Sequence, residues 1–375
     1  MTCRLRSCHH SPEMNRRFAI AFLALATLAA PGLPASAQPP PPLATAPGVV
    51  AAAHREGKVV VYSVTDRGIA APLLQDFAAL YPRIEVDYRE LRTAELYAQF
   101  VRVAEEGKVE ADLLWSPAMD LQMKLANDGL ALTYESPEGA RLPAWAVWRN
   151  EAFATTLEPF VFVHDQRRLP EAHVPKTHAE LTRMLETAGR GKVAAYDPER
   201  SAIGYLLLTQ DSRIDPGFAD AVRAYGKAGI ELHDTTSGMI DRVLSGDLLL
   251  AFNVNGSYAR EAQHREPSLG IVYPRDYVLA ASRIALIAKA APHPNAAKLF
   301  LDYLLSHRGQ EVLAQRCSLF SIRTDVAGDT SAAALSRELG ARLKPIHVGP
   351  SLLVYLDAAK RVGFLRRWKS AFAGR

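Results

Sequence analysis

From Lys58 onward, short runs rich in β-branched residues alternate with stretches that carry apolar residues at helical spacing. Val59–Tyr62 predicts a buried strand, and the helical stretch after it ends before Pro82. Two more strands are predicted, at Ile84–Tyr88 and Asp112–Trp115. This alternation is typical of parallel α/β structure, in which helices cover a sheet.

The alternation resumes after Thr156–Val163, an extended run that is too apolar for a surface loop. Strands are predicted beyond it at Lys192–Ala195 and Leu248–Asn253, and the extended runs Leu269–Pro274 and Ser282–Ile287 predict a return crossing. We therefore expect an α/β fold of two lobes joined by two extended crossings, with a helical C-terminal segment. The expected boundaries are residues 58–157 plus 283–335 for lobe 1, 158–282 for lobe 2, and 336–375 for a C-terminal segment that packs on lobe 1.

The N-terminal sequence has the order of a secretory signal: Arg16-Arg17, an apolar run at 18–30, and Ala35-Ser36-Ala37. The apolar run is shorter than the roughly 20 residues that a membrane span needs. The expected segments are a cleaved signal peptide over residues 1–37, with Met14 as a candidate start, and a Pro/Ala-rich tether over residues 38–57. A periplasmic location follows, without a lipid anchor, because no cysteine stands at the cleavage point.

Cleavage would leave Cys317 as the single cysteine, so no disulfide is expected within the chain, and a buried thiol is the expected state. The formal charge of +4 falls to near neutral once the arginines of the signal are removed. Nucleic-acid binding is not expected, because phosphate-binding surfaces need a clustered excess of basic residues.

Motifs of catalysis and of cofactor binding are missing from the sequence, among them G-x-S-x-G, H-E-x-x-H, C-x-x-C, the Walker loop and G-x-G-x-x-G. The histidines lack the spacing of metal ligands, so neither a metal nor a cofactor is expected. The chain is therefore expected to bind a ligand and not to be an enzyme.

Small polar clusters recur where predicted strands end and helices begin. Ligands of open α/β sheets bind at those ends, where free helix amides favour an anion. Five such clusters, divided between two lobes, predict a site for phosphate, phosphonate or carboxylate oxygens. The candidate ligand-binding residues are Ser63, Thr65 and Asp66; Trp115 and Ser116; Tyr196, Ser201 and Gly204; Thr236 and Ser237; and Asn255 and Tyr258.

Arg283 lies in the predicted return crossing, and two roles remain open for it. Its guanidinium group can donate a forked pair of hydrogen bonds to an anion, which makes it another candidate ligand-binding residue. It can equally form a salt bridge at the hinge with Glu158 or Asp276.

The segments that carry a family resemblance are Asp76-Phe77 to Tyr81-Pro82, Ala111 to Ser116, Thr156 to Pro159, Gly246-Asp247 to Asn253, and His307-Arg308-Gly309-Gln310. They resemble periplasmic substrate-binding proteins of ABC transporters, in the branch that contains ferric-iron, phosphosugar and aminoethylphosphonate binders. The resemblance implies a type II periplasmic-binding-protein fold and hinge closure on a ligand. It also implies delivery to an inner-membrane permease with a cytosolic ATPase.

One stretch departs from the ferric binders of this branch, which place two adjacent tyrosines after the asparagine-containing strand. The matching stretch here, Asn255-Gly256-Ser257-Tyr258, has one tyrosine. A small anionic solute is therefore the preferred ligand, and ferric iron bound by Tyr258 is the alternative. An exported phosphate-ester hydrolase and a liganded form that engages a membrane sensor are the other open functions.

The C-terminal tail has six basic residues after Asp357 and no acidic one. Such a tail can be an amphipathic helix with a solvated basic face, or it can contact a membrane or a partner. The solvated face is the favoured interpretation.

Overall fold

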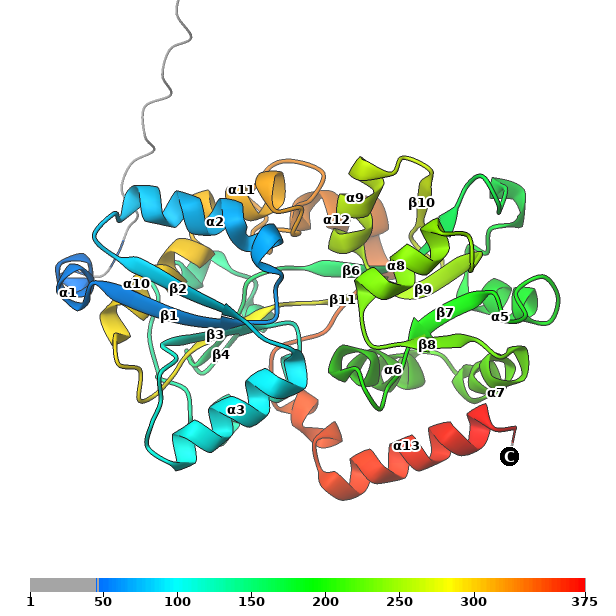
Figure 1. The fold of residues 1–375 in the computed structure, drawn as a ribbon, viewed down its shortest axis with the longest axis horizontal. Coiled ribbons are helices and arrows are strands. Elements are labelled where there is room, and N and C mark those ends of the chain that lie inside the picture. Colours follow the sequence, from blue (N-terminus) through cyan, green and yellow to red (C-terminus); the bar gives the residue numbers. More distant parts are fainter. Residues whose placement is uncertain (1–44, 46, 375) are drawn as a thin grey trace, which may run out of the picture. The chain divides into compact units, whose positions relative to one another are not determined.

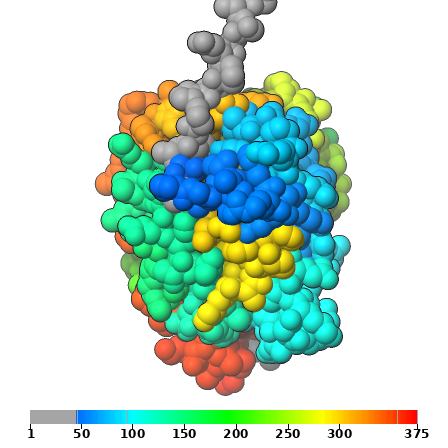
Figure 2. Space-filling view, turned by 90° about the vertical axis from the view of Figure 1, so that its left-hand side faces the viewer, coloured from blue at the N-terminus to red at the C-terminus, as the bar shows by residue number. Residues whose placement is uncertain are grey.

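The computed structural model describes residue 45 and residues 47–374, which form the two expected α/β lobes (Figure 1). The predicted signal peptide lies outside the described residues. The predicted tether is wrong in its described part, because Val49–Glu56 forms helix α1. Its buried residues, Val49 and Ala53, are four positions apart and so share one face. That face packs on α10 (Pro294–Leu305) at one end of lobe 1 (Figure 2).

The sheet of lobe 1 has the strand order β2-β1-β3-β12-β5-β4, in which β1 is parallel to both β2 and β3. Its strands are β1 (Lys58–Ser63), β2 (Glu85–Glu90), β3 (Leu113–Ser116), β4 (Val147–Trp148), β5 (Ala152–Ala154) and β12 (Ile284–Ile287). The helices of this lobe are α2 (Arg67–Leu80), α3 (Thr93–Glu105), α4 (Met119–Asn127), α10 and α11 (His307–Arg316), with 3-10 turns η1 (Gly139–Arg141) and η2 (Ala144–Ala146). Every residue of β3 is buried, as expected for a central strand covered on both faces.

The sheet of lobe 2 has the order β13-β11-β6-β9-β7-β8, and β10 also pairs with β6. Its strands are β6 (Glu158–Asp165), β7 (Val193–Tyr196), β8 (Glu231–His233), β9 (Leu250–Asn255), β10 (Leu269–Val272), β11 (Val278–Ala281) and β13 (Leu343–Pro345). The helices of this lobe are η3 (Glu171–His173), α5 (His178–Leu185), α6 (Ala202–Ile214), α7 (Phe218–Ala228), α8 (Thr236–Leu244) and α9 (Gly256–Arg265). After α11 the chain forms α12 (Ala332–Leu339), η4 (Gly340–Arg342), η5 (Pro350–Tyr355) and α13 (Ala358–Phe372).

The lobes are connected where β6 begins and where β11 ends. Glu158 of β6 pairs with Ala281 of β11, so the two crossings run side by side. The expectation that Leu269–Pro274 belongs to the return crossing is wrong, because β10 pairs with β6 inside lobe 2. The chain returns through the short link between β11 and β12, which contains Arg283.

The expectation that the C-terminal segment packs on lobe 1 is wrong for most of its length. β13 joins the lobe 2 sheet beside β11, η5 packs on α4 of lobe 1, and α13 packs on α7 of lobe 2 (Figure 1). Phe364 and Trp368 of α13 lie four residues apart on one helical face, and that face joins the apolar cluster of lobe 2. The sequence shows such a face, but the lobe that it meets is decided by tertiary packing.

Candidate functional site between the lobes

A cavity of about 550 Å³ lies between α2 of lobe 1 and α8 and α9 of lobe 2. The first turn of each helix contributes to its wall, through Gly68, Ser237 and Tyr258. The other lining residues are Asp66, Ile69, Ile240, Asp241, Leu244, Glu261, Ala262, Arg265 and Glu266. Its size and its position between two lobes are those of a small-molecule site.

Buried polar contacts connect the crossings to both lobes. Arg283 donates from Nε to Oγ1 of Thr65 at 2.7 Å, and its Nη1 pairs with Oε1 of Glu158. The second carboxylate oxygen of Glu158 accepts a hydrogen bond from Nδ2 of Asn255 at 2.8 Å. These four residues, here called the hinge circuit, come from lobe 1, from both crossings and from lobe 2. A change in the angle between the lobes therefore has to change at least one of these contacts.

The hinge circuit continues into the cavity through α9. Asn255 is the N-cap of this helix, and its Oδ1 accepts from the amides of Ser257 at 2.9 Å and Tyr258 at 3.4 Å. The phenol of Tyr258 lies against the carboxylate of Asp66 across the cleft, close enough for each group to shift the pKa of the other. Asp66 directly follows Thr65, so the contacts close into a loop that passes through both lobes.

Burial shifts the pKa of several groups at this site. Desolvation raises the pKa of Asp66, and the negative charge of Glu90 raises it further. Desolvation lowers the pKa of Arg283 to about 10, which leaves the guanidinium charged at neutral pH. It raises the pKa of Tyr196 to about 12 and also raises the pKa of Tyr258, so both phenols remain hydrogen-bond donors.

The sequence-predicted residues divide between the cavity, the hinge circuit and local structure. Those that line the cavity are Asp66, Ser237 and Tyr258. Those in the hinge circuit are Thr65, Asn255 and Arg283. The residues of the cavity and of the hinge circuit thus come from both lobes and from the crossings.

Of the two roles left open for Arg283, this structure holds the salt bridge. Its partner is Glu158, and both side chains are buried. Asp276, the other carboxylate considered, accepts a hydrogen bond from His178 and does not reach Arg283. The charge of Arg283 is therefore already compensated before any solute enters.

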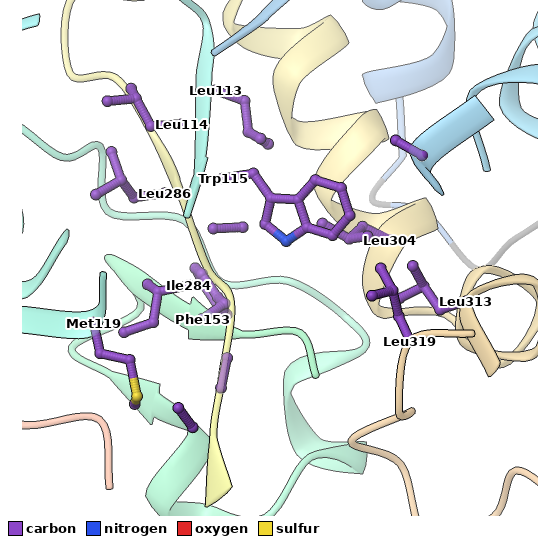
Figure 3. Close-up of a cluster of buried hydrophobic side chains, with 14 of the residues drawn as sticks. Leu113, Leu114, Trp115, Met119, Phe153, Ile284, Leu286, Leu304, Leu313 and Leu319 are labelled. Atoms are coloured by element: carbon purple, nitrogen blue, oxygen red, sulfur yellow. The ribbon is translucent and has the colours of Figure 1, made fainter. Parts of the chain in front are cut away.

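The expectation that Trp115 faces a ligand is wrong. Its indole Nε1 donates to Oγ1 of Thr155 at 2.8 Å, and the side chain is fully buried. Figure 3 shows the ring in the lobe 1 core, beside Leu304, Leu313 and Leu319. β3 is one of the two central strands of its six-stranded sheet, so its side chains point into helix layers and not into the cleft.

The remaining candidates stabilise local structure at the ends of strands. The hydroxyl of Tyr196 is hydrogen-bonded to that of Thr236, which ties β7 to the start of α8. A Cβ at Gly204 would lie 2.5 Å from that of Tyr196, so glycine is needed for the close approach of α6 to β7. Ser63 and Ser116 accept backbone amides in the turns that follow β1 and β3, and Ser201 caps α6 by accepting the amide of Gly204.

The family profile described as bacterial extracellular solute-binding protein matches residues 73–336, more than half of the sequence. The chain belongs to this family. Within the family's fold it also resembles a curated phosphoglycerate transport regulatory protein of Salmonella typhimurium, with 25% identity over 226 residues. That match covers 60% of this chain and 55% of the relative, so the chain spans about half the length of the curated relative.

Solved structures show the same fold over most of the chain. The substrate-binding protein of an ABC transporter from Agrobacterium tumefaciens is 38% identical, with a TM-score of 0.80, over 84% of this chain and 94% of that one. AfuA of Actinobacillus pleuropneumoniae, with exogenous fructose-6-phosphate bound, is 18% identical, with a TM-score of 0.70, over 84% and 98% of the two chains. Iron-bound HitA of Pseudomonas aeruginosa is 17% identical, with a TM-score of 0.67, over 84% and 99%. These comparisons confirm the resemblance to periplasmic substrate-binding proteins.

Sequence reasoning missed the acidic part of the cavity wall. Asp241 follows Ser237 by four residues on α8, and Glu261 follows Tyr258 by three on α9, so each shares a helical face with a predicted residue. Glu266 lies just past the end of α9. Extending each predicted helix start along its own face would have found the first two.

Among the described residues, no group of three or more histidine, cysteine, aspartate or glutamate side chains could hold a metal ion. A search of the same residues finds no helix long and apolar enough to cross a membrane.

Proposed function

We propose that this chain is a periplasmic binding protein that closes its lobes over a small anionic solute and delivers it to an ABC permease driven by a cytosolic ATPase. The observation that carries the proposal is the meeting of the first turns of α2, α8 and α9 at one cavity. Each helix N-terminus brings the positive end of its dipole to the cavity, which favours an anion, and in α8 and α9 the side chains of Thr235 and Asn255 already cap part of the free amides. α2 has no side-chain cap from Asp66; its first amide, that of Arg67, donates to Glu90, and the next two, of Gly68 and Ile69, are left for a phosphate, phosphonate or carboxylate.

The charged side chains of the cavity wall indicate which class of anionic solute fits. Its ionisable side chains are Asp66, Asp241, Glu261, Glu266 and Arg265, so carboxylates outnumber the guanidinium group. Carboxylates accept hydrogen bonds from hydroxyl and ammonium groups. The solute therefore carries donor groups beside its anion, as do phosphorylated polyols, sugar phosphates and aminoalkyl phosphonates. The phosphoglycerate and fructose-6-phosphate named for two similar proteins support this class.

Calorimetric titration of the purified protein tests the proposal. The titrants are 2- and 3-phosphoglycerate, fructose 6-phosphate, aminoethylphosphonate, citrate and ferric citrate. Ser237→Asp places a negative charge at the start of α8 inside the cavity and is expected to weaken anion binding at least tenfold. Ser351→Asp adds the same charge at an exposed position on η5 and should leave the affinity unchanged. Equal affinity in the unsubstituted protein and in both variants would show that the solute does not bind in this cavity.

Ferric iron is a second candidate, favoured by one contact. The phenol of Tyr258 and the carboxylate of Asp66 meet across the cleft, and both are oxygen donors suited to a hard cation. Iron-bound HitA shares the fold. If iron alone bound, with a visible phenolate-to-metal absorption band that Tyr258→Phe abolishes, the ligand would be iron and not an anion.

Regulation is a further candidate, favoured by the printed name of the curated relative, a transport regulatory protein. In that role the closed, liganded form would engage a membrane sensor. Deleting the gene and measuring both solute uptake and solute-induced transcription separates the two roles. If the protein activates a sensor, the deletion abolishes induction even when the permease is expressed independently. Hydrolysis of a chromogenic phosphate ester by the pure protein would contradict our inference that the chain only binds.

A further inference from the structure

Helix α13 is attached to lobe 2 by one face. Phe364 and Trp368 are buried in the apolar cluster of that lobe, and the ring of Phe372 stacks on that of Trp368 at 4.9 Å. A Cβ at Gly226 of α7 would overlap the backbone of Phe372, so the two helices approach closely here. The apolar face of α13 is therefore used up by packing within the chain.

The opposite face of α13 is basic. The helix has five basic residues and no acidic one. Two of the five have partners on lobe 2: Arg361 lies over the ring of Tyr205, 4.2 Å from its centroid, and Lys369 pairs with Glu199 at 2.7 Å. The other three, Lys360, Arg366 and Arg367, are exposed and form no ion pair with any described residue. An uncompensated positive charge remains on the surface of the helix.

Small residues form the floor between these cations. Ala359 and Gly363 are four residues apart, and with Lys360, Phe364 and Arg367 they line a groove of about 420 Å³. Val362 on the same helix is 55% exposed, more than any other large hydrophobic residue described. A floor of alanine and glycine lets another backbone approach closely, while the cations stand at its sides.

Two kinds of anionic occupant could use a basic helix, a lipid surface and a protein segment. A helix that binds in a lipid interface buries its apolar face among the acyl chains. The apolar face of α13 is already buried against lobe 2, which removes that mode of binding. The open groove instead fits a second helix, because the small residues allow close packing and the flanking cations complement acidic side chains.

We propose that the basic face of α13, formed by Ala359, Lys360, Gly363, Arg366 and Arg367, docks an acidic helix of a protein partner. α13 lies along the lower edge of Figure 1, well away from α8 and α9, which line the solute cavity. The docked partner therefore leaves the cavity accessible. This role does not depend on which solute the cavity binds.

The test uses a labelled 20-residue helical peptide with glutamate at every third or fourth position, and a glutamine version of it. Fluorescence anisotropy at low salt should show binding of the glutamate peptide to the protein, with weaker binding as salt is added. Lys360→Gln/Arg366→Gln/Arg367→Gln is expected to weaken this binding at least fivefold. Gly363→Leu, which fills the groove without changing charge, should weaken it as well.

The matched control is Arg183→Gln/Arg190→Gln/Arg213→Gln, which removes three exposed positive charges from other parts of lobe 2. Equal loss in the control triple variant would show that net charge alone attracts the peptide and would overturn the proposal. Unchanged binding in Gly363→Leu would overturn the groove as the docking surface. Preferential binding to vesicles of phosphatidylglycerol and phosphatidylcholine, lost in the first triple variant, would show that α13 binds a membrane and not a protein helix. Circular dichroism checks that each variant is folded.

Discussion

Arg283 and Glu158 form an ion pair where the two crossings run side by side, and each side chain is only 2% exposed. Removing two charges from water is costly unless further hydrogen bonds satisfy them. Here Thr65 accepts from the guanidinium group, and Thr156 and Asn255 donate to the carboxylate. Of these contacts, the ion pair itself joins the two crossings, so it fixes their relative position at the hinge.

Glu158→Gln keeps the shape of the side chain and removes its charge. The guanidinium group of Arg283 would then be buried without a counter-charge, and a loss of about 3 kcal/mol in the free energy of unfolding is expected. Urea denaturation followed by circular dichroism measures it. Glu158→Gln/Arg283→Met removes both charges and should recover part of the loss. If the loss in the double variant equals the sum of the losses in Glu158→Gln and Arg283→Met, each measured alone, the two residues act independently.

The sequence predicts those parts of the fold that depend on local patterns. The strand predicted at Leu248–Asn253 is β9 shifted by two residues, and the strand predicted at Lys192–Ala195 is β7 shifted by one. The sequence allows Arg283 to pair with Glu158 or with Asp276. Glu158 is 125 positions away, and no local pattern chooses between the two carboxylates. Such choices depend on how the lobes pack.

The candidate site was predictable in part for the same reason. Asp66, Ser237 and Tyr258 lie in or next to helix starts, which have a recognisable sequence pattern, and all three line the cavity. Trp115 has the same pattern around it but points into a helix layer, because the sheet order places β3 in the middle. Strand order is not encoded near the residue itself.

Asp120 of α4 is a buried carboxyl group without a hydrogen-bond partner among the described residues. Desolvation raises its pKa to about 6. Because the folded-state pKa exceeds the unfolded one, the native state prefers the protonated form, and stability falls as pH rises through about 4 to 6. Asp120→Asn should therefore stabilise the protein at pH 8 by about 1–3 kcal/mol and have little effect at pH 4.

Thermal unfolding at the two pH values measures the effect of Asp120→Asn. Asp128→Asn is the matched control, since this exposed residue follows the same helix and contacts Lys124 and Asn127 at the surface. Its effect should stay below about 1 kcal/mol at both pH values. The same shift for Asp120→Asn at pH 4 and pH 8 would contradict the buried charge as its cause.

Trp115→Ala separates a core residue from a ligand-binding one. Loss of a fully buried indole and of its hydrogen bond to Thr155 is expected to cost about 3–5 kcal/mol of unfolding free energy. Solute affinity, measured by calorimetry at a temperature where the variant is folded, should change less than twofold. Trp148→Ala, at a half-buried edge position, should cost much less stability. A large loss of affinity with little loss of stability would return Trp115 to the binding site.

Tyr258→Phe tests the contact that closes the loop across the cleft. The substitution removes the hydroxyl group that faces Asp66 and leaves the ring in place. Losing a polar contact of the order of one hydrogen bond, about 1 kcal/mol, should raise the ratio of open to closed protein without solute about fivefold. Single-molecule energy transfer between dyes at Glu106→Cys and Arg213→Cys, one on each lobe, reports the ratio, since the native Cys317 is buried. Tyr97→Phe, a half-buried tyrosine of α3, serves as control. The same distance distribution in all three proteins would show that the Asp66 contact does not hold the lobes together.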